Sequence, residues 1–217
     1  LYLNKGDYNK ALEYATLFLE LSQEISDHNG IAHGFRAIGY IHFDQGMNDL
    51  ALDYFSKALN IHKNIGDKNG IIGTLLNIGS LYESKLDLDV TVDYFKEALT
   101  ISNDIDAKHS IAYILAQLGN VYKKQGDFVL ALNYLNRALT MVDEIGVQGG
   151  SVEVLNDIGI IYYQKGDYKI ALEYLEKSLQ LRNNIDLGFA YDTASIILRL
   201  SQKYLSRQYD LAEIHTL

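Results

Sequence analysis

The sequence predicts an all-α fold, a right-handed superhelical solenoid of antiparallel helix pairs. The chain contains no proline, which would break helices. Its apolar residues are spaced by three and four, as at Ala51, Phe55 and Ala58, which places them on one helix face. The strongest observation is an internal repeat. The segment Ala11-Leu12-Glu13-Tyr14 has counterparts at a step of forty residues, at 51–54, 91–94, 131–134 and 171–174.

Each unit of forty residues is predicted to hold two helices. In the unit that begins near residue 27, we expect the first helix over about residues 31–45 and the second over about 50–65. Gly46 lies between them, where a glycine just past a helix end can adopt the left-handed conformation. The link to the next unit contains Gly66 and then Asp67, so it predicts a glycine stop followed by an aspartate cap.

A glycine also recurs inside each first helix, at residues 39, 79, 119 and 159. An interior glycine costs about 1 kcal/mol relative to alanine, so close packing must offset it. We expect Gly39 to let the small Ala51 of the partner helix approach. The third copy has Leu86 in place of the turn glycine and Thr91 in place of the alanine, so its helices are expected to pack less closely.

The period divides residues 1–217 into a single array of repeats. A half unit covers 1–26, complete units cover about 27–66, 67–106, 107–146 and 147–186, and a partial unit covers 187–217. Solenoids normally finish with a polar capping helix, and neither end has one in its sequence. We therefore expect a fragment of a longer chain, with apolar ends that self-associate or fray, notably around Leu205, Leu211 and Ile214.

Composition and motifs exclude several classes of function. The net charge of -9 disfavours a nucleic-acid partner, which would call for clustered lysine and arginine. Cysteine is absent, so thiolate catalysis and zinc-thiolate sites are excluded. No stretch approaches about 18 consecutive apolar residues, and we expect no membrane insertion. The histidines show no metal-binding spacing, and no nucleotide loop or serine elbow occurs, so we expect no enzyme activity, metal or cofactor.

These features resemble the tetratricopeptide repeat family. Small and aromatic residues fall where that family has them, at Gly39, His42, Gly46, Ala51, Phe55 and Ala58. The usual repeat has about 34 residues and ends in proline. This chain repeats at forty without proline, and looks like the longer variant in LGN/Pins-type adaptors, kinesin light chains and bacterial signalling proteins. The resemblance implies that a peptide or helix binds in a groove formed by the first helices.

The resemblance also implies which residues face that groove. Tyr40, Tyr113 and Tyr163 fall outside the packing series and would be aromatic anchors for a partner. The alternative is that they only pack against neighbouring helices. Amides can hold a ligand backbone because they both donate and accept, or they can be solvated or bond between helices. The candidate ligand-binding residues are Arg36, Tyr40, Asn77, Tyr113, Gln117, Asn120, Asn156 and Tyr163.

The predicted function is a non-enzymatic, cytoplasmic scaffold that binds a protein or peptide. One alternative is a sensory or regulatory arm of a larger bacterial signalling protein, such as a kinase or transcription regulator. Another is part of a peptide-regulated phosphatase. The sign of the ligand's charge stays open, because the predicted face carries both signs, with Arg36 and Lys123 against Glu83, Glu153 and Asp157.

Overall fold

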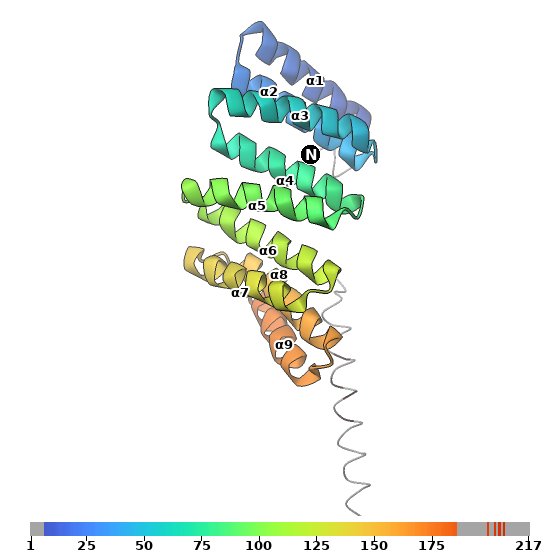
Figure 1. The fold of residues 1–217 in the computed structure, drawn as a ribbon, viewed down its shortest axis with the longest axis vertical. Helices are drawn as coiled ribbons and strands as arrows, with labels where there is room; N and C mark the ends of the chain where they lie inside the picture. The colour runs from blue at the N-terminus through green and yellow to red at the C-terminus, as the bar shows by residue number, and fades with distance from the viewer. Residues whose placement is uncertain (1–6, 186–198, 200–201, 203, 205, 207–217) are drawn as a thin grey trace, which may run out of the picture. The chain divides into compact units, whose positions relative to one another are not determined.

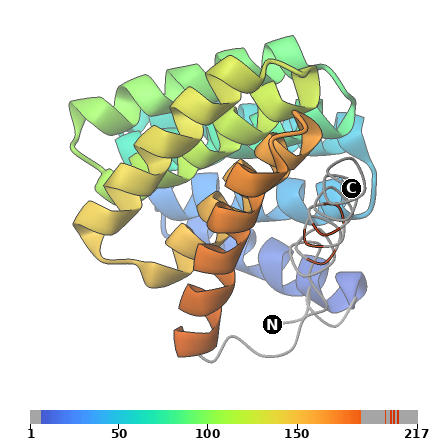
Figure 2. The same ribbon diagram turned by 90° about the horizontal axis from the view of Figure 1, so that it is seen from below.

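The computed structural model describes residues 7–185 and the single residues 199, 202, 204 and 206. Residues 7–185 form nine α-helices and no strand, which confirms the predicted all-α repeat solenoid. Coiled ribbon runs through this part of the chain in both views (Figures 1 and 2). The helices are α1 (Tyr8–Glu24), α2 (His28–Asp44), α3 (Asn48–Ile65), α4 (Lys68–Ser84), α5 (Leu88–Asp104), α6 (Lys108–Gln125), α7 (Phe128–Ile145), α8 (Gln148–Gln164) and α9 (Tyr168–Ile185).

The chain divides into two compact units, unit 1 (Leu1–Ser110) and unit 2 (Ile111–Leu217). In unit 1, each of the helices α1 to α4 packs against the helix that follows it in the chain, and α2 also contacts α4 (Figure 1). In unit 2, α7 packs against α8 and α8 against α9. Of the expected partial unit at residues 187–217, only four single residues are described, and its apolar positions Leu205, Leu211 and Ile214 lie outside the described residues.

The helices end at turns that the sequence marks with glycine. Gly46 and Gly66 have φ angles of 77° and 70°, both in the left-handed region. Asp67 then caps α4, and its Oδ1 accepts a hydrogen bond from the amide of Gly70 at 3.0 Å. The predicted glycine stop and aspartate cap are therefore confirmed at this link.

Leu86 replaces the turn glycine in the third copy and still adopts the left-handed conformation, with a φ of 60°. Its side chain is 80% exposed, so no core packing holds it there. A residue with a Cβ costs about 1–2 kcal/mol in this conformation. The turn thus keeps its shape without glycine, at a moderate local cost.

The interior glycines make room for a large side chain of the partner helix. A Cβ built on Gly39 would lie 2.8 Å from Cδ1 of Phe55 and 3.2 Å from the carbonyl oxygen of Ala51. Phe55 is fully buried. The expected close approach to Ala51 is therefore present, but the tightest contact is with the ring four residues later.

The third copy packs as closely as the others, so the expectation of looser packing is wrong. A Cβ on Gly79 would lie even nearer to the ring of Phe95 than the equivalent atom on Gly39 does to Phe55. Thr91 is fully buried, and its hydroxyl donates to the carbonyl oxygen of Asp87 at 2.9 Å and lies 3.3 Å from that of Gly79. The hydroxyl therefore has a hydrogen-bond acceptor inside the helix pair, and threonine fits where alanine was expected.

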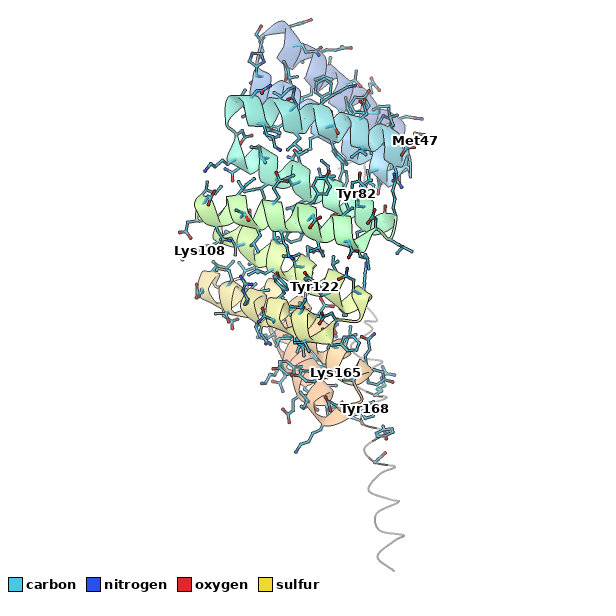
Figure 3. All side chains as sticks on the ribbon, in the orientation of Figure 1. Met47, Tyr82, Lys108, Tyr122, Lys165 and Tyr168 are labelled. Atoms are coloured by element: carbon cyan, nitrogen blue, oxygen red, sulfur yellow. The ribbon has the colours of Figure 1, made fainter. Side chains whose placement is uncertain are left out.

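Aromatic residues of the repeat stack between the two helices of each pair. The rings of Tyr82 and Tyr94 lie 5.6 Å apart, and those of Tyr122 and Tyr134 lie 5.4 Å apart, both nearly parallel. Tyr82 and Tyr122 are labelled on their first helices in Figure 3. Tyrosines in these series therefore serve packing, as the period predicts.

Candidate functional site

The candidate residues of unit 1 lie on α2 and α4. Tyr40 is 45% exposed, and its ring meets Phe43 of the same helix edge to face at 6.4 Å. Arg36 precedes Tyr40 by four residues, so the two side chains are neighbours on the surface of α2. Asn77 lies on α4 and is half-buried, as is Arg36. The candidate residues of unit 1 therefore include one exposed aromatic ring with a cation beside it.

The candidate residues of unit 2 lie on α6 and α8. Tyr113, Gln117 and Asn120 follow each other at intervals of four and three, so they share one face of α6. Tyr113 is 53% exposed and Gln117 is half-buried. Tyr163 on α8 is half-buried, and its ring meets that of Tyr168 edge to face at 5.4 Å. This contact favours the packing interpretation for Tyr163 and leaves Tyr113 as the more exposed ring.

Two of the candidate amides turn their oxygen inward. Oδ1 of Asn120 and Oδ1 of Asn156 are buried and have no hydrogen-bond partner among the described residues. The residues themselves are half-buried, so the exposed part of each belongs to other atoms. A ligand could reach these amides through Nδ2, or through Oδ1 after the side chain rotates.

An ion pair joins α6 to α8 next to these amides. Nζ of Lys123 lies 2.5 Å from Oδ1 of Asp157, and the two side chains are only 17% and 18% exposed. Both residues belong to the predicted face, where each could have offered its charge to a ligand. In the structure they neutralise each other.

Unit 1 contains a buried histidine that the sequence analysis did not single out. His62 on α3 is fully buried, and its Nδ1 lies 2.8 Å from Oδ2 of Asp67. Its ring meets that of His33 on α2 edge to face at 5.1 Å. The other copies have Ser22, Ser102, Val142 or Arg182 at this register. A histidine at a register where two other copies have serine was the signal that could have revealed it.

Arg36 reaches from α2 toward α4 beside this histidine. Its Nη2 lies 3.5 Å from Nδ1 of His33. A Cβ on Gly73 of α4 would lie 2.6 Å from Nη1 of Arg36, so the guanidinium occupies space that a side chain there would need. Burial lowers the pKa of Arg36, and the negative charge of Asp67 acts in the opposite direction.

The buried histidine predicts that unit 1 loses stability as the pH falls. Burial lowers the pKa of His62 from its ordinary value of 6.5; Asp67 opposes this effect, and the charges of His33 and Arg36 add to it. The unfolded chain therefore binds more protons than the folded chain below pH 6.5, and stability falls from there toward the lowered pKa. Each unit of difference between the two pKa values is worth about 1.4 kcal/mol.

His62→Ser should flatten this dependence, measured as urea unfolding between pH 7 and pH 5. Serine suits the position, because Ser102 at the same register donates its hydroxyl to the carbonyl oxygen of Ala98 at 2.8 Å. His109→Ser, at an exposed histidine of α6, is the matched control and should keep the slope of the parent chain. Equal slopes in all three proteins would contradict the assignment of the pH dependence to His62.

Two further observations concern metal binding and membrane insertion. In the part of the chain that the structure describes, no three His, Cys, Asp or Glu side chains are placed to hold a metal ion. Within the same part, none of the helices has the length and apolar character needed to cross a membrane.

Known family models match most of the chain. Models of the tetratricopeptide repeat match residues 1–64, 70–144 and 152–185. A search of the curated proteins found no match.

Solved structures share the fold at low sequence identity. BtubC from P. vanneervenii is 19% identical with a TM-score of 0.81, over 92% of this chain and 84% of that one. The repeats of a putative kinesin light chain from Podosopora anserina are 12% identical with a TM-score of 0.67, over 86% of this chain and 92% of that one. Aspartyl phosphate phosphatase F from Bacillus subtilis is 14% identical with a TM-score of 0.76, over 87% of this chain and 51% of that one.

Proposed function

Because the chain belongs to the tetratricopeptide repeat family, we propose that it is a non-enzymatic scaffold whose first helices bind a protein or peptide partner. In unit 1 these helices are α2 and α4, and in unit 2 they are α6 and α8. All eight candidate residues belong to the proposed binding surface, and they differ in how much they are expected to contribute to affinity. Tyr113 and Tyr40 are its proposed anchors because both rings are exposed, and Tyr163 is a secondary contact because it is half-buried.

The exposed tyrosines carry this proposal. The repeat needs its tyrosines at the stacked positions, as in the pair Tyr122 and Tyr134. Tyr113 stands outside that series, and the other complete copies have His33, Gly73 or Glu153 at its register. A large aromatic side chain that is half exposed, at a register where the other complete copies have no aromatic ring of this size, is the kind of residue that anchors a partner.

The amides would hold the partner's backbone beside these anchors. Asn77 and Gln117 stand at the same register of successive first helices, and both are half-buried. Asn120 and Asn156 can contribute through Nδ2, since their Oδ1 atoms are enclosed. Amide groups suit a peptide backbone because one side chain can both donate to a carbonyl and accept from an N–H.

A second candidate is that the chain forms the repeat region of a peptide-regulated phosphatase. The fold likeness to aspartyl phosphate phosphatase F, of which this chain covers 51%, favours it. The repeats of this chain would also bind a protein or peptide in that case, as they would in a regulatory arm of a signalling protein. Phosphatase activity of the intact protein would then separate this candidate from a scaffold.

The test is capture of a partner from the native source, followed by affinity measurements on purified variants. Tyr113→Ala should weaken binding at least about 10-fold, because loss of a central anchor typically costs ~2 kcal/mol. Asn77→Ala should weaken it to a smaller extent. Each variant is first compared with the parent chain by circular dichroism and thermal unfolding, so that loss of binding is not loss of fold.

Two changes on second helices serve as controls. Tyr14→Ala removes a tyrosine of α1 that is 54% exposed, nearly the same fraction as Tyr113. Glu173→Ala removes an exposed charge from α9. Both should leave the affinity unchanged. A partner that ignores Tyr113→Ala and Asn77→Ala but responds to these two changes binds on second helices, and the proposed face is then wrong.

A further inference from the structure

Arg36 carries a positive charge that no carboxylate in the described residues neutralises by direct contact. Its Nη2 lies 3.5 Å from Nδ1 of His33, at the limit of a hydrogen bond. The guanidinium is half-buried, and its desolvation is what lowers its pKa. A guanidinium has five N–H donors, so Arg36 can donate several hydrogen bonds to a ligand.

Asp67 is the acid whose charge acts on Arg36, and its two oxygens lie close to other groups. Oδ1 accepts the amide of Gly70 at 3.0 Å and so caps α4. Oδ2 lies 2.8 Å from Nδ1 of the buried His62. Asp67 therefore acts on Arg36 through its charge and does not form the paired contact that a guanidinium prefers.

The position of the guanidinium depends on a glycine that this copy alone has. Gly73 stands at the register of His33, Tyr113 and Glu153, where the other complete copies have a side chain. Because a Cβ there would lie 2.6 Å from Nη1, the glycine lets Arg36 extend across α4. Asn77 follows Gly73 by four residues on α4, and Tyr40 follows Arg36 by four on α2. The charge thus lies among the proposed binding residues of unit 1.

Unit 2 supplies a contrast within the same fold. Its first-helix cation Lys123 is neutralised by Asp157 at 2.5 Å. A carboxylate from the neighbouring first helix thus neutralises this largely buried cation. Among the described residues of unit 1, no carboxylate forms an ion pair with Arg36.

We propose that unit 1 binds an acidic side chain of the partner at Arg36, between α2 and α4, so that the partner's contact segment is acidic at this point. The inference rests on the proposed function and assigns the charge of the ligand at this site. A carboxylate fits the planar guanidinium through two parallel hydrogen bonds, which a neutral amide cannot match in strength. The carboxylate comes from an aspartate or glutamate side chain and does not have to be a chain terminus.

The test uses a capped peptide, acetyl-hexaglutamate-amide, titrated into the full chain at low ionic strength. The Nε–Hε signal of Arg36 and the amide signal of Gly73 are followed by NMR. Both should shift with the glutamate peptide, and neither should shift with acetyl-hexaglutamine-amide. Arg36→Gln should weaken the binding at least about 10-fold, as expected for loss of a charge-assisted contact.

Matched variants and a second anion complete the test. Arg137→Gln removes the same charge from an exposed site on α7 and should keep the affinity of the parent chain. Gly73→Ala should displace the guanidinium and weaken the peptide, which tests the site without removing the charge. Unchanged affinity in both Arg36→Gln and Gly73→Ala overturns the inference. It is also overturned if the glutamate peptide shifts only the NMR signals of lysines. Inorganic phosphate that shifts Arg36 as strongly as the glutamate peptide would overturn the assignment to a carboxylate.

The outcome is separable from the test of the proposed function. If the glutamate peptide fails to reach Arg36 while Tyr113→Ala still weakens the captured partner, only the acidic contact is wrong. If the peptide binds at Arg36 while the partner ignores every first-helix variant, the anion site stands and the proposed binding face is rejected.

Discussion

Replacing Gly119 with leucine is expected to lower the free energy of unfolding by about 2 kcal/mol or more. A Cβ at this position would lie 2.6 Å from Cγ of Leu135 and 3.2 Å from the carbonyl oxygen of Ala131. Leu135 and Ala131 are both fully buried on α7, so neither can move aside without opening the core. Leucine has a better helix propensity than glycine, but this stabilises the helix by less than about 1 kcal/mol. The cost of overpacking is larger, so the free energy of unfolding falls.

Urea unfolding measures this effect, and Gly149→Leu is its control. Gly149 lies in the first turn of α8, and a Cβ there meets nothing within 4 Å. The same substitution should therefore change the stability by no more than about 0.5 kcal/mol. Equal midpoints for Gly119→Leu and the parent chain would mean that the glycine series does not mark close contacts.

Replacing Lys123 with methionine is expected to lower the free energy of unfolding by about 2 kcal/mol or more. The substitution keeps most of the apolar stem but leaves the carboxylate of Asp157 in a site where that side chain is only 18% exposed. An unpaired charge that is largely withdrawn from water loses hydration without gaining a partner. Because the pair bridges α6 and α8, its loss should act on the packing of unit 2.

An exposed pair of nearly the same length is the control. Nζ of Lys57 lies 2.6 Å from Oδ2 of Asp53, but these side chains are 48% and 54% exposed. Lys57→Met should therefore cost no more than about 0.5 kcal/mol. The double variant Lys123→Met with Asp157→Leu should be less destabilised than the two single changes together predict. Equal effects of Lys123→Met and Lys57→Met would show that burial does not set the strength of the pair.

The sequence predicted the helices and turns because their causes are local. The step of forty residues placed the helix pairs, and α3 ends at Ile65 as expected. Gly66 and Asp67 form the predicted stop and cap. α2 begins three residues earlier than expected, at His28, because Asp27 accepts from the amide of Asn29 and caps the helix there.

The contacts between helices were less predictable, because they depend on distances that a repeat pattern does not contain. Thr91 looked too large for an alanine position, yet its hydroxyl finds the carbonyl oxygen of Asp87. Lys123 and Asp157 are 34 residues apart, and their pairing requires the relative placement of α6 and α8. The sequence located candidate residues on first helices but could not show that Oδ1 of Asn120 turns inward, because that depends on a side-chain rotamer.

The packing of each helix of unit 1 against its neighbour in the chain has a consequence for how the protein folds. Most tertiary contacts of α1 to α5 join residues that are close in sequence, so little loop-closure entropy is lost before a contact forms. Topologies of this kind have low contact order and fold on the microsecond to millisecond scale. Synthesis adds only about 5–20 residues each second. The helix pairs of unit 1 can therefore form on the ribosome while α9 is still being translated, which shortens the time for which buried residues such as Phe55 face water.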